Sequence, residues 1–119
     1  MDMHFEGVIF HTHAAELERR MAHPFPPFVV LDVRSPADHG ESRIPGSVLV
    51  DPGKMESLPA GTTQATEVFV VGTSHVDPGV RRTALALKGL GVRRVVEVTG
   101  GYREWRRRGF PEEPGRSAA

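Results

Sequence analysis

The chain has 119 residues, enough for one domain with a single hydrophobic core and too few for two. Apolar residues make up 39% and charged residues 25%, a composition typical of folded rather than disordered proteins. The formal net charge is +0 and no apolar run reaches 18 residues, so the composition argues against nucleic-acid binding and against a membrane span.

The sequence contains no cysteine, and this excludes several kinds of chemistry together. Disulfides, thiolate metal sites, persulfide carriage and cysteine nucleophiles all need a thiol. The first residues lack the basic and apolar regions of a signal peptide, so we expect a cytoplasmic protein.

Taken in chain order, residues 8–11 predict a short strand, and Thr12 is the expected N-cap of a helix over residues 13–21. The prolines that follow end this helix. Three nearly unbroken apolar runs rich in β-branched residues come next along the chain, at residues 28–33, 68–71 and 95–98. Such runs are typical of parallel strands that are buried on both faces.

Residues 80–90 have helical spacing of apolar positions, and together with the strands on either side they predict a βαβ unit. Residues 102–108 predict a short last helix in which Trp105 is most simply a core residue. The polar residues 112–119 are expected to be a loosely held tail. We therefore expect residues 1–119 to form one domain, with its core at about residues 8–111.

Three segments resemble the rhodanese-like family. Leu31–Ser47 is similar to its D-V-R segment followed by I-P-G, and Thr99–Pro111 is similar to its G-G-aromatic, tryptophan and G-x-P ending. The third segment is the strand, loop and helix of Val68–Arg82. The resemblance implies an α/β fold with a central, mainly parallel sheet of about four or five strands and helices on both faces.

The loop that follows the apolar run at residues 68–71 departs from the family. The resemblance implies a cysteine at Thr73 or Ser74 and a closing arginine at the place of Gly79, and neither is present. A hydroxyl cannot carry sulfane sulfur as a thiolate does, so we expect no thiosulfate sulfurtransferase activity and assign no catalytic residue. His75 is too close in sequence to Thr73 to predict an ordinary nucleophile and base pair.

We name this segment the degenerate loop; it comprises Gly72, Thr73, Ser74, His75, Val76, Asp77, Pro78 and Gly79. Asp77 is expected near the N-cap of the next helix, where its carboxylate would satisfy backbone donors that an anion would otherwise use. A small anion could still bind at this helix N-terminus.

Four further residues are candidates for contact with a ligand or an anion at this loop: Asp32, Arg34, Arg81 and Arg82. For Asp32 and Arg34, a structural ion-paired shell beneath the loop is favoured over ligand contact. For Arg81 and Arg82, a solvated surface is the simpler interpretation.

Two other groups of residues could bind a metal or a partner. His11 and His13 could offer imidazoles to a metal from one face of a strand, but the sequence supplies no third ligand nearby, so we expect no metal site and no cofactor. The six arginines from Arg93 to Arg108 favour a solvated face or an acidic protein partner over nucleic acid.

The sequence therefore leads to two functional hypotheses. The first is a non-catalytic module that binds an unknown protein partner or a small anion at the degenerate loop. The second is an accessory part of sulfur-relay chemistry that relies on a partner's thiol. Residues 61–119 carry ten basic and six acidic side chains, so an anion preference is expected in this half. A monomer or a weak homo-oligomer is expected.

Overall fold

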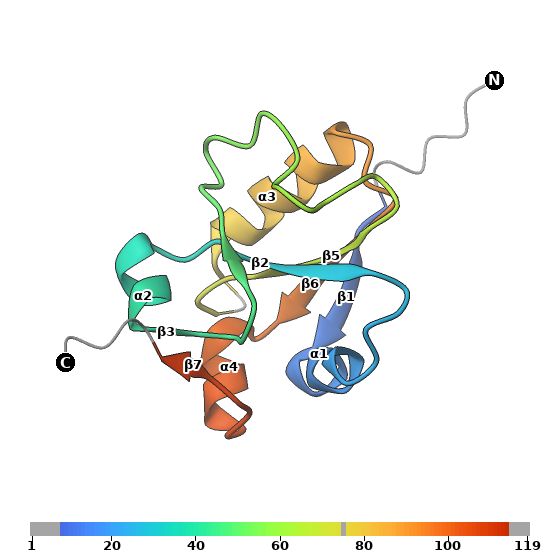
Figure 1. Cartoon of the computed structure of the whole chain (residues 1–119). Helices are drawn as coiled ribbons and strands as arrows, with labels where there is room; N and C mark the ends of the chain where they lie inside the picture. Colours follow the sequence, from blue (N-terminus) through green and yellow to red (C-terminus); the bar gives the residue numbers. More distant parts are fainter. Residues whose placement is uncertain (1–7, 75, 115–119) are drawn as a thin grey trace.

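The structure is a computed structural model and describes residues 8–74 and 76–114. A five-stranded parallel sheet lies at its centre, in the order β1-β6-β5-β2-β4 (Figure 1). Its strands are β1 (Phe10–His13), β2 (Phe28–Asp32), β4 (Val48–Leu49), β5 (Glu67–Val71) and β6 (Arg94–Thr99). The expected α/β class and parallel sheet are confirmed.

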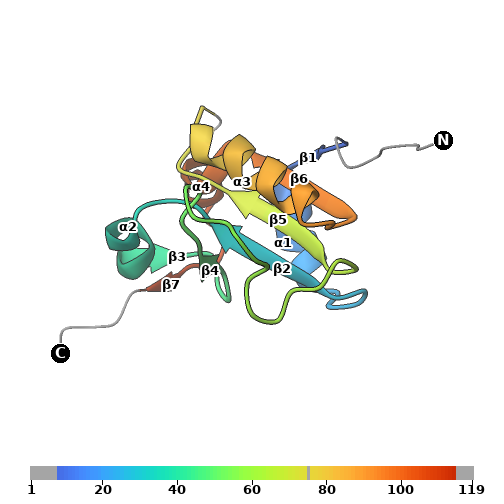
Figure 2. The same ribbon diagram turned by 90° about the horizontal axis from the view of Figure 1, so that it is seen from above.

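Helices cover both faces of this sheet. They are α1 (Ala14–Met21) and α4 (Gly101–Arg107) on one face and α3 (Pro78–Gly89) on the other. A further helix, α2 (Pro36–Glu41), has no buried residue and covers neither face. Seen from above, α3 lies on one side of the sheet and α1 on the other (Figure 2). A two-stranded antiparallel ribbon, β3 (Ser42–Arg43) with β7 (Glu113–Pro114), lies next to α2.

The central strands are buried on both faces, which explains their unbroken apolar sequences. Within β5, Val68 and Val70 pack into the core beneath α3, while Phe69 and Val71 pack into the core shared by α1 and α4. Alternate side chains of a strand point to opposite faces, so both sets must be apolar. Trp105 is 1% exposed and anchors the second core, as expected.

The N-terminal elements are displaced from their predicted positions. The first strand covers Phe10–His13 instead of residues 8–11, and the cap of α1 is His13 instead of Thr12. The reason is that Thr12 is paired with Val98 in the sheet and so cannot begin the helix.

Within the segment expected to be a loose tail, residues 113–114 form a strand. Glu113 and Pro114 pair with β3, and the Glu113 carboxylate accepts hydrogen bonds from Arg43 and from the Gly46 amide. Residues 115–119 lie outside the described residues. Within the part of the chain that is described, no helix has the length and apolar character needed to cross a bilayer.

Candidate functional site

The degenerate loop connects the C-terminal end of β5 to α3 and is held at its base by α4. The Gly72 carbonyl accepts a hydrogen bond from the Tyr102 amide (2.8 Å), and the Thr73 carbonyl accepts one from the Arg103 amide (3.0 Å). Gly101 has a φ of +62°, and a Cβ atom there would lie 2.6 Å from the Gly72 carbonyl oxygen. The loop and the start of α4 are therefore packed backbone against backbone.

The carboxylate of Asp77 lies inside the loop and accepts hydrogen bonds from two of its backbone amides. Oδ2 accepts from the Thr73 amide at 2.8 Å, and Oδ1 accepts from the Gly79 amide at 2.9 Å. Asp77 is the N-cap of α3, with Pro78 at the first turn, as the sequence predicts. These amides are thus already bonded to a negative group of the chain itself.

Ser74 is the buried hydroxyl of the loop. Ser74 is 8% exposed, and among the described residues its Oγ makes only a long contact of 3.5 Å with the Val76 amide. Among the described residues, no histidine is hydrogen-bonded to this hydroxyl or to that of Thr73, which is exposed. His75 lies outside the described residues. The described loop thus shows no base in position to activate a hydroxyl nucleophile.

Asp32 and Arg34 form a buried ion pair. The Arg34 side chain donates to both Asp32 carboxylate oxygens at 2.8 to 3.1 Å and to the Ser42 carbonyl at 2.7 Å. Nδ1 of His39 lies 2.8 Å from the same carboxylate. Burial acts to raise the pKa of Asp32, but the hydrogen bonds from Arg34 and His39 outweigh it and hold the pKa below its usual value.

The Asp32–Arg34 ion pair contacts further polar groups, and these connect segments that are far apart in the sequence. The Arg34 guanidinium lies 3.9 Å from the centre of the Tyr102 ring, and the Tyr102 hydroxyl contacts Ser42 Oγ (2.8 Å) and donates to Glu112 (2.7 Å). Burial, followed by the Glu112 carboxylate, raises the pKa of Tyr102. The Nε and Nη2 donors of Arg34 are thus bonded to Asp32 and Ser42, and the guanidinium lies over the Tyr102 ring, as expected for an ion-paired shell beneath the loop.

Arg81 and Arg82 have different surroundings. Arg81 donates two hydrogen bonds to Glu97 (2.6 and 3.1 Å), and Nε2 of His11 lies 3.0 Å from the same carboxylate. These residues line a cavity of about 410 Å³ that also reaches Ser74 and Asp77. Arg82 extends over the chain after β4, where its Nη2 lies 3.3 Å from the Cβ position of Gly53. The structure therefore places the two arginines on different sides of the loop.

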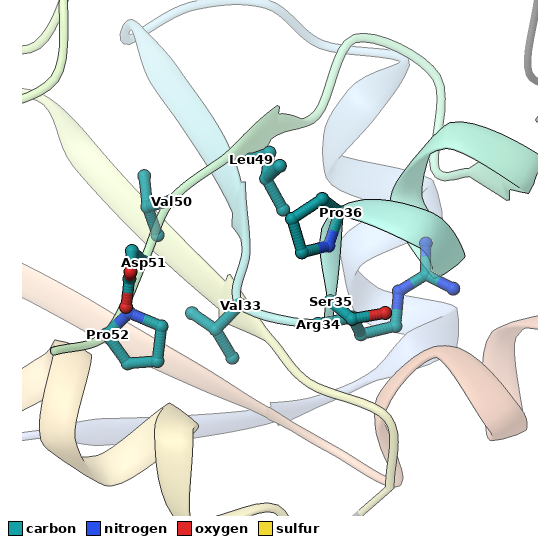
Figure 3. Close-up of a pocket in the computed structure, with 8 residues that line it drawn as sticks. All are labelled: Val33, Arg34, Ser35, Pro36, Leu49, Val50, Asp51 and Pro52. Carbon is teal, nitrogen blue, oxygen red and sulfur yellow. The ribbon is translucent and has the colours of Figure 1, made fainter.

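A second pocket of about 360 Å³ opens between the C-terminal ends of β2 and β4 (Figure 3). It is lined by Val33, Arg34, Ser35, Pro36, Leu49, Val50, Asp51 and Pro52. The Arg34 guanidinium points away from the other labelled side chains, so only the atoms of Arg34 near the backbone line the pocket.

The rhodanese-like domain family matches residues 13–108 of the sequence. The chain belongs to the rhodanese-like family. Its fold is similar to the Alr3790 protein from Anabaena, with a TM-score of 0.78 and 22% identity over 90% of this chain and 95% of that one. The BH2092 protein from Bacillus halodurans gives a TM-score of 0.77 and 21% identity, over 88% and 77% of the two chains.

A rhodanese-like domain protein from Staphylococcus aureus is similar at a TM-score of 0.69 and 18% identity, over 82% of this chain and 91% of that chain. No curated protein sequence matches. At these identities the likeness to solved structures shows the rhodanese-like fold alone.

Sequence reasoning missed two parts of this rhodanese-like site. The pocket beside Asp51 and the polar chain through Ser42, Tyr102 and Glu112 were not predicted. The polar turn Asp51–Gly53 directly after an apolar segment is a signal that could have pointed to the pocket, because strand ends in such sheets carry ligand-facing groups. The polar chain has no such signal, since Ser42 and Tyr102 are 60 positions apart.

Proposed function

We propose that this chain is a non-catalytic rhodanese-like module that binds a protein partner through the face carrying the degenerate loop. The observation that carries the proposal is the position of Asp77, whose carboxylate accepts hydrogen bonds from the Thr73 and Gly79 amides. A free anion would have to compete with an intramolecular carboxylate for these donors and would meet its charge at close range. This favours a protein partner over a small anion.

The same contact argues against a role as the acceptor of a partner's persulfide. A thiolate or persulfide from another protein is an anion and would need inward-facing donors at the loop. Within the described loop, the amides of Thr73, Asp77 and Gly79 have acceptors from the loop itself at 2.8 to 3.2 Å, and the Val76 amide makes a long contact of 3.5 Å with Ser74 Oγ. Most of the donors that the sulfur-relay alternative would need at the loop are therefore already used within it.

The surface of the loop supports protein binding in a further respect. Val76 is 71% exposed, so the loop presents an apolar side chain to solvent. In a complex with a protein partner this side chain would be removed from water, which would favour association.

A sulfurtransferase assay of the purified chain tests the non-catalytic part of this proposal. With thiosulfate as sulfur donor and cyanide as acceptor, thiocyanate formation should equal that of the buffer alone, because no thiol is present. An active cysteine-containing rhodanese in the same buffer is the positive control. Turnover by this chain above the buffer rate would overturn the proposal.

A further inference from the structure

The pocket between β2 and β4 has the size and lining of a binding site. At about 360 Å³ it falls within the range of pockets that hold small ligands or single side chains. Its apolar walls are Val33, Pro36, Leu49, Val50 and Pro52, and Leu49 and Pro36 lie close together on one side of it (Figure 3).

The polar groups of the pocket are nearly all used within the chain. The Arg34 guanidinium is bonded to Asp32 and Ser42, and the Ser35 hydroxyl accepts from the Asp38 amide as the N-cap of α2. Asp51 is exposed, and one of its carboxylate oxygens accepts from the Gly53 amide. Asp51 is therefore the charged residue of the pocket lining that has no ion pair with another described residue.

This pocket shares a wall with the degenerate loop. A Cβ atom built on Gly79 would lie 3.1 Å from Cγ of Pro52 and 3.4 Å from Cγ2 of Val33. Both of these residues line the pocket. A partner that enters the pocket would thus touch the face to which we assign the function.

The two segments that form the pocket, α2 and the chain around and after β4, carry more acidic than basic side chains, although Lys54 and the nearby Arg82 offset part of this charge. Four exposed carboxylates in these segments have no ion pair with another described residue: Asp38, Glu41, Asp51 and Glu56. Among the other described carboxylates only Glu18 and Asp77 lack an ion pair with a described residue; both are half-buried, and Asp77 is bonded to the loop. Such a surface favours a cationic partner.

We propose that this pocket takes an aliphatic side chain from a protein partner, presented by a segment with basic residues on either side of it. The apolar walls would bury the aliphatic group, and Asp51 with the neighbouring carboxylates would attract the basic residues. The inference rests on the proposed function, because it names the chemistry of the partner that the module binds.

Capped tripeptides added to the full-length, ¹⁵N-labelled chain test this inference by amide NMR. The probe is acetyl-lysine-leucine-lysine-amide, and two controls change one feature each: glutamates replace the lysines, or glycine replaces the leucine. The probe should shift amides in residues 33–36 and 49–52. Each control should bind roughly tenfold more weakly, because charge attraction or burial of the leucine is lost.

A matched pair of variants tests the role of Asp51. Asp51→Asn keeps the acceptor for the Gly53 amide and removes the charge, so affinity for the basic probe should fall about two- to fivefold. Glu18→Gln removes a carboxylate that has no ion pair with a described residue and lies on α1, on the other face of the sheet, so it should leave the affinity unchanged.

Equal binding of the acidic and basic probes, or no shift in residues 33–36 and 49–52, would overturn this inference. These outcomes leave the proposed function intact, since that proposal fails instead on sulfur turnover or on anion-induced shifts in the degenerate loop. The two failures therefore appear in different residues and with different probes.

Discussion

Asp77 decides the chemistry of this site at the level of a single residue. Its carboxylate bonds to the amides of Thr73 and Gly79 from inside the loop, and as N-cap it also offsets the positive end of α3. The cysteine position, at Thr73 or Ser74, has a hydroxyl to which no described histidine is hydrogen-bonded. The loop thus has no thiol, and it holds the Asp77 carboxylate against two of its own amides.

Asp32 is the residue whose ionisation should matter most for stability. Asp32→Asn leaves the Arg34 guanidinium buried without its counter-charge, so the free energy of unfolding at pH 7 should fall by about 3–5 kcal/mol. Urea unfolding measures this change. Asp38→Asn, at an exposed carboxylate of α2 without an ion pair to a described residue, should change it by less than about 0.5 kcal/mol.

The pH dependence of the two proteins should also differ. The folded-state pKa of Asp32 is lowered, so its contribution is fully present above the unfolded value of about 3.9 and is lost as the pH falls through the lower folded value. The wild-type chain should therefore lose more stability than Asp32→Asn between pH 5 and more acidic conditions. Parallel pH profiles for the two proteins would contradict this role for Asp32.

At the scale of elements, the start of α4 supports the degenerate loop. The amides of Tyr102 and Arg103 bond to the carbonyls of Gly72 and Thr73, and the close approach depends on Gly101 having no side chain. The loop conformation is therefore set by α4 as well as by β5 and α3.

Gly101→Ala should destabilise the chain and disturb the loop. The added Cβ would lie 2.6 to 2.8 Å from loop backbone atoms, at a positive φ, so we expect a loss of about 2–3 kcal/mol in the free energy of unfolding. Gly40→Ala is the control, because its Cβ meets nothing within 4 Å in α2, and it should be neutral or stabilising by up to about 1 kcal/mol. Equal effects of the two substitutions in thermal unfolding would contradict the account of α4.

The long elements could be predicted from the sequence because their patterns are local. The valine-rich strands and the helix that follows Asp77 were located to within about two residues, since their side chains reveal burial on two faces or on one. The strand at Phe10–His13 was misplaced because its limits depend on pairing with β6, which local sequence does not reveal. For the same reason β3 and β7 were missed, as Ser42 pairs with Pro114 far along the chain.

The residues of the candidate site could be predicted from the sequence, but their contacts could not. Capping rules predict Asp77 at the start of α3, and the strand ends point to Asp32 and Arg34. The direction of the Arg34 guanidinium follows from contacts with Ser42 and Tyr102 that form only in the folded chain. The pocket beside Asp51 likewise arises from two segments, β2 with α2 and β4 with its following turn, brought together by the sheet.

At the scale of the whole molecule, the chain keeps the rhodanese-like frame and lacks the groups that make such a frame a sulfurtransferase. The parallel sheet and its helices match the family, while cysteine is absent and two of the loop amides, those of Thr73 and Gly79, are bonded to Asp77. The exposed Val76 and the pocket beside Asp51 are the features on which the proposed contact with another protein rests.

Titration of thiosulfate into the ¹⁵N-labelled chain, beside the Asp77→Gly variant, tests this account most directly. Glycine retains most of the capping preference while it removes the carboxylate, so the variant should fold and bind the anion with shifts at the Thr73 and Gly79 amides. In the wild-type chain these amides should not move beyond the change given by sodium chloride at equal ionic strength. Saturable shifts at Thr73 and Gly79 in the wild-type chain, equal to those of the variant, would contradict the claim that Asp77 occupies the anion site.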